Sequence, residues 1–138
     1  MYRKDDYFTN QHSCFLLQYH LVLITKYRHK VITGMVKDDL MQYTRNYFKE
    51  QELILDEINS DEDHIHILFT AYPNMNLAKF VNAYKSASAR YVRKENAEFL
   101  EKYYWKPYFW SSSYFICTVS DRSEAVIRQY IKNQGNKK

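Results

Sequence analysis

Residues 61–70 read DEDHIHILFT, and this stretch indicates how the chain folds. The segment from His64 is short, β-prone and apolar in alternation, which predicts a strand. Successive side chains of a strand point to opposite faces, so Ile65 and Ile67 should face a core while His64 and His66 face away from it. The prediction is a sheet covered by helices on the isoleucine side, with two imidazoles together on the other side.

Working outward, the pattern predicts strands at 14–25, 53–58 and 109–119 and helices at 36–50, 76–93, 95–103 and 121–134. Asn76 and Asp121 are the expected N-caps, and Gly135 the expected end of the last helix. With the 64–70 strand, the order βαββαβα and one short extra helix predict an α+β fold. It is a ferredoxin-like or RNA-recognition-like antiparallel sheet with helices on one face. The last helix is surplus to that core and can cross the open face of the sheet or pack on another subunit.

The 138 residues predict one domain, residues 1–138. Cys14 and Cys117 form no CxxC pair and are expected to be reduced core residues. No apolar leader or membrane-length apolar run is visible, so we expect a cytoplasmic protein without a membrane partner. The net charge is +4, and the basic stretch 79–94 suits either a polyanion with exposed bases or a plain solvated helix face.

His64 and His66 are candidate metal ligands, because neighbouring imidazoles on one strand face can share a divalent ion. Two ligands are too few for a structural zinc site, and the open positions would suit water and substrate oxygens. The alternative is a pair of half-exposed strand histidines, since the motif alone is weak. Glu62 shares the histidine face and is a candidate to orient one imidazole.

Ile127, Tyr130, Ile131 and Gln134 share one face of the last predicted helix. A buried amide needs a partner, and the Gln134 oxygen could complete a metal site with His64 and His66, unless it is simply solvated at the helix end. Tyr130 would then be the nucleophile toward a metal-bound phosphate. Its attack would leave a phosphotyrosine and a free sugar hydroxyl, and the strand could be rejoined without ATP.

Five ordered motifs carry a family resemblance over nearly the whole chain. The chain resembles the insertion-sequence 200/605 family of single-tyrosine HUH transposases. The motifs are Tyr19-His20-Leu21-Val22 with Lys26-Tyr27-Arg28, Asp63-His64-Ile65-His66-Ile67-Leu68, Lys85-Ser86-Ala87-Ser88-Ala89-Arg90, Trp110 with Ser113-Tyr114-Phe115-Ile116-Cys117-Thr118-Val119, and Tyr130-Ile131-Lys132-Asn133-Gln134.

The resemblance implies a single-stranded DNA transposase that cuts and rejoins the hairpin-marked ends of a mobile element through a 5′-phosphotyrosine at Tyr130. It implies Mg²⁺ or a similar ion such as Mn²⁺. It also implies a homodimer in which Tyr130 of one subunit can serve His64 and His66 of the other. By charge and by resemblance, the candidate DNA contacts are Lys26, Arg28, Lys30, Lys79, Lys85 and Arg90.

Two other functions fit parts of the sequence. One is a non-catalytic, RNA-recognition-like nucleic-acid-binding domain in which Tyr130 is merely packed. The other is a domesticated relative that nicks hairpins but no longer moves an element. The sequence departs from the family pattern in the loop before the last helix, residues 118–122, which contains no glycine to act as a hinge.

Overall fold

The computed structural model describes residues 2–4 and 6–134. Its main sheet has the strand order β5-β6-β4-β7, with all neighbours antiparallel. The strands are β4 (Leu17–Ile24), β5 (Ile54–Asp61), β6 (His64–Ala71) and β7 (Phe115–Thr118). Counted in chain order, this is the 4-1-3-2 arrangement of a ferredoxin-like sheet. The predicted α+β fold is therefore confirmed.

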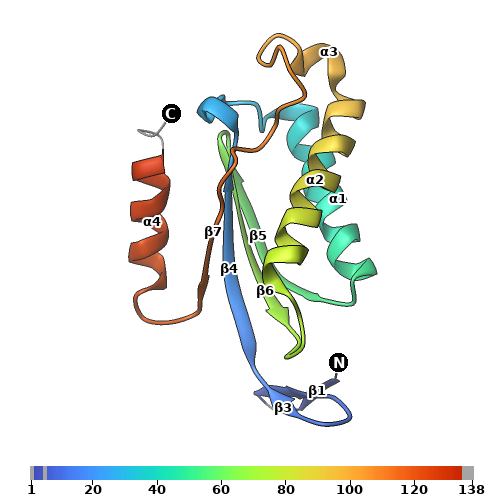
Figure 1. Cartoon of the computed structure of the whole chain (residues 1–138), viewed down its shortest axis with the longest axis vertical. Helices are drawn as coiled ribbons and strands as arrows, with labels where there is room; N and C mark the ends of the chain where they lie inside the picture. The colour runs from blue at the N-terminus through green and yellow to red at the C-terminus, as the bar shows by residue number, and fades with distance from the viewer. Residues whose placement is uncertain (1, 5, 135–138) are drawn as a thin grey trace.

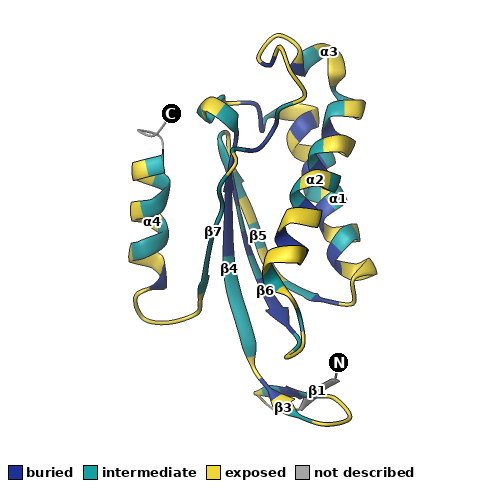
Figure 2. Ribbon diagram, in the orientation of Figure 1, coloured by how far each residue is buried: buried dark blue, intermediate teal, exposed yellow. Residues whose placement is uncertain are grey.

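Helices α1 (Gly34–Glu50) and α2 (Leu77–Glu95) cover one face of the sheet, and the short α3 (Ala97–Leu100) follows α2 (Figure 1). The core lies in this layer, and it includes Leu21 and Leu23 of β4 and Ile65 and Ile67 of β6. Figure 2 shows the buried residues concentrated in the strands and on the inner sides of α1 and α2. The predicted orientation of the isoleucines is confirmed.

Helix α4 (Ser123–Gln134) lies on the opposite face of the sheet (Figure 1). Val22 and Ile24 of β4 point to this side and are 0% and 1% exposed, so the face is covered rather than open. The inward side of α4 is the predicted one, because Ile127, Tyr130, Ile131 and Gln134 are half-buried. Within this single chain, the surplus helix packs across its own sheet.

The predicted strand 109–119 is wrong over most of its length. Strand β7 begins at Phe115. Within residues 109–114, the one pairing is an isolated antiparallel bridge between Trp110 and Thr25, the residue after β4. The cause is a donor that competes with strand pairing. The Lys85 ammonium donates to the carbonyl oxygens of Ser111 and Ser112 at 2.9 and 3.1 Å. Residues 111–113 form a loop as a result.

Two smaller expectations also need correction, and one further sheet was not expected. Asn76 caps α2 as predicted, but α4 begins at Ser123, where Ser120 and Ser123 rather than Asp121 provide the hydrogen bonds of the turn. Cys14 is exposed and Cys117 half-buried, so the two free thiols are not core residues. A three-stranded N-terminal sheet of β1 (Tyr2–Lys4), β2 (Tyr7–Thr9) and β3 (Cys14–Phe15) was not predicted. Gly135 lies outside the described residues.

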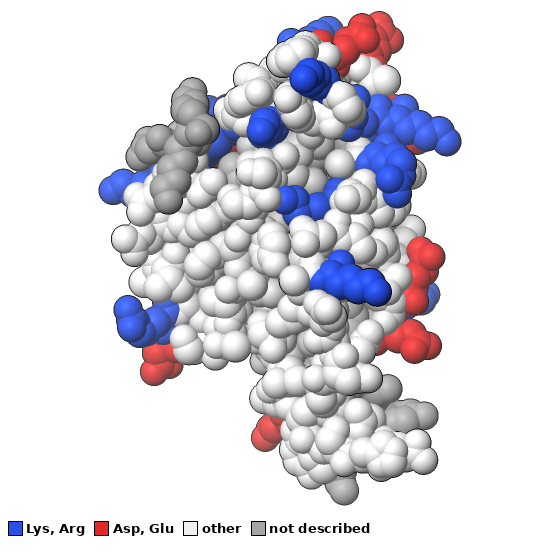
Figure 3. Space-filling model, in the orientation of Figure 1, with Lys and Arg blue, Asp and Glu red and all other residues white. Residues whose placement is uncertain are grey.

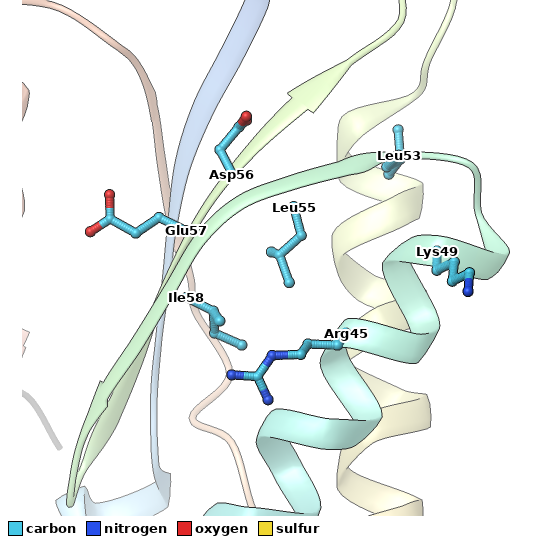
Figure 4. A pocket seen from close by; sticks show the side chains of 7 residues that line it. All are labelled: Arg45, Lys49, Leu53, Leu55, Asp56, Glu57 and Ile58. Carbon is cyan, nitrogen blue, oxygen red and sulfur yellow. The ribbon is translucent and has the colours of Figure 1, made fainter.

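Strand β5 contains a bulge that decides which of its side chains reach the histidine face. Leu55 pairs with Phe69 and Glu57 with Leu68, so the extra residue Asp56 shifts the alternation. In Figure 4, Leu55 and Ile58 point toward α1 while Glu57 extends to the other side of the strand. The bulge therefore brings a carboxylate to the face that carries the imidazoles.

The helices of residues 2–4 and 6–134 are short or carry many polar side chains. No helix there combines the length and the apolar content that a bilayer crossing would require.

Candidate active site

His64 is held by a carboxylate from the residue before it. Its Nδ1 lies 2.9 Å from Oδ1 of Asp63, and the other carboxylate oxygen accepts from Nε of Arg28 at 2.9 Å. The carboxylate accepts a hydrogen bond from Nδ1–H, so the neutral form of His64 has its lone pair on Nε2, as metal-binding histidines commonly do. The prediction that Glu62 orients an imidazole is wrong, because Glu62 is exposed and Asp63 does this.

Asp63 is ionised over the whole neutral range. Burial alone would raise its pKa, but the hydrogen bonds from His64 and Arg28 outweigh burial and lower the pKa below its ordinary value of 3.8. A charged Asp63 is the form that can accept from both neighbours at once. The carboxylate therefore fixes the tautomer of His64 at the pH at which an enzyme would work.

His66 pairs with a histidine of the neighbouring strand. His20 Nδ1 lies 2.9 Å from His66 Nε2, and the two rings stack at 5.1 Å. Burial lowers the pKa of both imidazoles, and the neighbouring His20 lowers that of His66 further, while Glu57 raises both. Both rings are neutral near pH 7, which is the protonation state that a metal ligand needs.

A cavity of about 510 Å³ opens between these rings and α4. Its polar lining comes from β4, β5, β6, the start of α4 and the loop before α4. The lining residues are His20, Glu57, His66, Ser120, Ser123, Glu124, Ile127 and Ile131. The histidine face is thus accessible beneath the helix and is not sealed by packing.

Tyr130 and Gln134 both bind Ser113. The Tyr130 hydroxyl lies 3.2 Å from Ser113 Oγ, and Gln134 Nε2 donates to the same oxygen at 3.0 Å. The Tyr130 ring also stacks on Phe115 of β7 at 5.0 Å. Gln134 is therefore half-buried, and its amide nitrogen is bonded within the fold rather than free at the helix end.

The structure places all four candidate residues on one face of the sheet but does not bring them into contact. Tyr130 and Gln134 lie over β7, whereas His64 and His66 project from β6, and β4 separates these strands. Two strand spacings amount to about 10 Å between backbones. Because Ser113 holds both Tyr130 and Gln134, chemistry that uses all four side chains requires these two to leave Ser113.

Arg28 links the two halves of the candidate site. Its Nη1 donates to the carbonyl oxygen of Ile131 at 2.6 Å, in the last turn of α4, while its Nε donates to Asp63. A carbonyl in a last helical turn has no intrahelical partner, so an arginine there stabilises the helix end. The guanidinium thus connects the partner of His64 to the helix that carries Tyr130.

The predicted DNA contacts fall into two groups. In the first, the cationic groups contact other parts of the fold: Lys26 lies near the rings of Tyr27 and Tyr108, Arg28 donates to Asp63, and Lys85 donates to Ser111. Burial also lowers the pKa of Lys85. In the second, Lys30, Lys79 and Arg90 are exposed, and Arg90 lines a groove of about 490 Å³ between α2 and residues 107–112. Figure 3 shows Lys and Arg gathered over the upper half of the visible face. The DNA contacts remain predictions.

Acid should remove the contribution of Asp63 to stability. Its pKa in the folded state lies below its ordinary value of 3.8, so its stabilisation is complete above about pH 5 and is lost as the pH falls through the lower folded value. Asp63→Asn should lower the free energy of unfolding by about 1 kcal/mol at pH 7 and by less at pH 3, where the unfolded carboxyl is already largely protonated. Urea unfolding at the two pH values measures this, and an equal loss at both would contradict it.

Comparison with known proteins agrees with this fold. The model of the family described as "Transposase IS200 like" matches residues 13–134, so the chain belongs to the IS200-like transposase family. The ISDra2 transposase TnpA of Deinococcus radiodurans is 37% identical over 121 residues, which is 88% of this chain and 86% of that protein. The IS200 transposase of Salmonella typhimurium is 27% identical over 123 residues, covering 89% and 80%.

Solved structures show the same relationship. A crystal structure of a candidate transposase from Deinococcus radiodurans R1, at 1.90 Å resolution, is 34% identical and superposes with a TM-score of 0.84, covering 91% of this chain and 96% of that one. A REP-associated tyrosine transposase bound to a REP hairpin is 7% identical, with a TM-score of 0.50 over 91% of this chain and 74% of that one. The second similarity shows a shared fold alone.

Proposed function

We propose that this chain is a single-stranded DNA transposase that cleaves and rejoins strands through a covalent bond to Tyr130. The observation that supports this most directly is the position of α4. The helix carries Tyr130 and Gln134 and covers the face from which His64 and His66 project, above a cavity that reaches His66. A non-catalytic nucleic-acid-binding domain, in which Tyr130 is only a packing residue, would not need this arrangement.

In the proposed reaction, the phenolic oxygen of Tyr130 attacks a phosphorus atom of the DNA backbone. The bond from Tyr130 to phosphorus forms as the bond to the 3′ oxygen of the departing strand breaks, and that oxygen leaves as a 3′ hydroxyl. The phenolic proton goes to a base in the cavity or to water, and the departing 3′ oxygen takes a proton from water. Rejoining reverses the step with an incoming 3′ hydroxyl, and the phosphotyrosine conserves the energy of the phosphodiester.

The residues present fit a divalent ion. His64 offers a free Nε2 with its tautomer set by Asp63, and His66 is a neutral imidazole on the same strand face. Within residues 2–4 and 6–134, no group of three or more His, Cys, Asp or Glu side chains could hold a metal. The amide oxygen of Gln134 is the proposed third protein ligand. A bound Mg²⁺ or Mn²⁺ would neutralise and polarise the phosphate.

A rearrangement of α4 is part of the proposal. In the free chain, Ser113 binds Tyr130 and Gln134, so both must leave it before they can reach the histidines. The helix can shift from β7 toward β6 on its own sheet, or it can occupy the equivalent place on the partner in a homodimer. The loop before it is exposed at Val119, Ser120, Asp121 and Arg122, which leaves the chain free to be redirected.

The proposed DNA partner is a single strand with a hairpin near the cleavage site. A neighbour with the same fold is bound to a REP hairpin, which supports a hairpin ligand for this chain as well. The direct test incubates the protein with a hairpin-bearing oligonucleotide, labelled at its 3′ end, and Mg²⁺, followed by a denaturing gel. A labelled protein–DNA adduct that EDTA prevents is expected, and binding without any adduct would favour a non-catalytic domain.

Asp63→Asn should weaken metal binding by about 10- to 100-fold, because an amide holds the His64 tautomer less firmly and lowers the basicity of the ring. Titration calorimetry with Mn²⁺ measures this effect. Glu62→Gln is the matched control, since it removes the same charge from the preceding, exposed residue. Equal weakening in both variants would mean that general electrostatics, not the Asp63–His64 contact, controls the site.

A further inference from the structure

An exposed cluster of aromatic rings and cations lies at the end of the sheet where β4 leaves it. The turn η1 (Lys26–Arg28) and the segment after α3 meet there, and both lie at the upper end of the molecule in Figure 1. We call this cluster the aromatic platform, and it consists of Tyr27, Trp105, Tyr108, Lys26 and Lys106. The catalytic chemistry proposed above uses none of these side chains.

The rings of the platform are arranged edge to face. Trp105 meets Tyr108 at 6.3 Å and 88°, and Tyr27 meets Tyr108 at 5.9 Å and 90°. Perpendicular contacts leave ring faces uncovered, unlike a continuous stack. Trp105 is 75% exposed and Tyr27 is 51% exposed, so their faces are available to a flat ligand.

Two lysines lie beside these rings. Lys26 Nζ is 5.3 Å from the Tyr27 centroid and 5.0 Å from the Tyr108 centroid, and Lys106 Nζ is 4.6 Å from that of Trp105. Exposed aromatic faces next to cations match a chain in which flat bases alternate with phosphates. An apolar protein partner would require the rings but not the lysines.

The platform is held in place before any ligand binds. Tyr27 and Arg28 have φ values of 59° and 53°, a conformation that persists in residues other than glycine only when the surroundings enforce it. The Tyr104 hydroxyl donates to the carbonyl of Lys26 at 2.9 Å, and Arg93 Nη1 donates to that of Tyr108 at 3.0 Å. A fixed platform loses little entropy when it binds a ligand.

The same turn reaches the candidate active site. Tyr27 lies on the platform, and the next residue, Arg28, contacts Asp63, which in turn binds His64. We propose that the aromatic platform stacks unpaired bases of single-stranded DNA flanking the phosphate that is cut; this inference rests on the proposed function. The ligand is a single strand because bases paired within a duplex do not offer their faces to side chains.

Tryptophan fluorescence tests the platform without catalysis. The protein has two tryptophans, and Trp110 is only 7% exposed, with its indole N–H bound to Ser88 at 3.0 Å. A thymidine 12-mer added in EDTA should quench the emission of Trp105. A charge-matched abasic oligonucleotide of the same length should not, because it carries phosphates but no bases.

Trp105→Leu should weaken binding of the 12-mer about tenfold, while Trp105→Phe should retain most of the affinity. Tyr91→Leu is the control, since Tyr91 is an exposed aromatic residue at 36% that stacks on Tyr43, away from the platform. Fluorescence anisotropy of a labelled 12-mer measures all four proteins.

Three outcomes would overturn the inference. They are unchanged affinity in Trp105→Leu, equal quenching by the abasic chain, and shielding of Trp105 from iodide that grows with protein concentration in the absence of DNA. The last would show a second copy of the chain on the platform. Failure of the proposed function is seen separately, because a wild-type protein that stacks bases in EDTA but forms no adduct with Mg²⁺ would reject the transposase chemistry alone.

Discussion

Replacement of Tyr130 by phenylalanine should abolish the covalent protein–DNA adduct and slow strand cleavage by at least about 10³-fold. The change removes the hydroxyl and keeps the ring, which stacks on Phe115 at 5.0 Å. The fold should therefore survive, while the nucleophile and one hydrogen bond to Ser113 are lost. The readout is a denaturing gel of an oligonucleotide labelled at its 3′ end, because the fragment attached to the tyrosine keeps that label.

Tyr19→Phe is the matched control for this experiment. Tyr19 lies on β4, on the opposite face of the same sheet, where its ring contacts Phe69 at 5.9 Å. It should form the adduct at the wild-type rate. An adduct that persists in Tyr130→Phe would show that another residue attacks the phosphate and that Tyr130 only packs.

Local periodicity was enough to predict the sheet faces and the inward face of α4. In β6 the alternation of histidine and isoleucine is uninterrupted, so a residue's position along the strand decides its side. In α4 the spacing of Ile127, Tyr130 and Gln134 decides the face in the same way. Because the structure places α4 on the histidine side (Figure 1), these two patterns bring the paired imidazoles and the tyrosine to the same face of the sheet.

The partners of these residues depend on relations between segments that a single sequence does not display. His20 reaches His66 through the register of β4 against β6, and Ser113 reaches Tyr130 through a loop. The Arg28 contact with Asp63 requires two successive residues in the left-handed region, which neither tyrosine nor arginine favours. Glu57 reaches the site because of a bulge. The carboxylates just before His64 are a local signal for a residue that orients the imidazole. Strand alternation favours Glu62, which shares the histidine face, although Asp63 is the observed partner.

The error at residues 109–119 has a related cause. The segment is rich in aromatic and β-branched residues, and propensity favours a strand throughout. Strand propensity is a local property and does not account for Lys85 of α2, whose ammonium donates to two backbone carbonyl oxygens of the segment. The resulting loop carries Ser113, so the departure from strand structure positions the residue that holds Tyr130 and Gln134.

Mixing two inactive variants should restore activity if the helix works across a dimer. Tyr130→Phe chains keep His64, and His64→Ala chains keep Tyr130. In a two-fold dimer with exchange of α4, a mixed dimer holds one site with both residues and one with neither. Random reassortment makes half of the dimers mixed, so about one quarter of the wild-type cleavage is expected.

The structure makes this experiment decisive, because α4 covers the histidine face of its own sheet while its Tyr130 is held at Ser113. Tyr130 is held on β7 through Ser113 and Phe115, while His64 lies two strands away. If a shift within one chain closed that gap, neither variant could complete a site in any dimer, and the mixture would remain inactive. Mixtures of each variant with itself give the background, and native mass spectrometry of chains of unequal mass shows that mixed dimers have formed. Cleavage near a quarter would place Tyr130 beside the partner's histidines, whereas cleavage at background from confirmed mixed dimers would place the whole reaction within one chain.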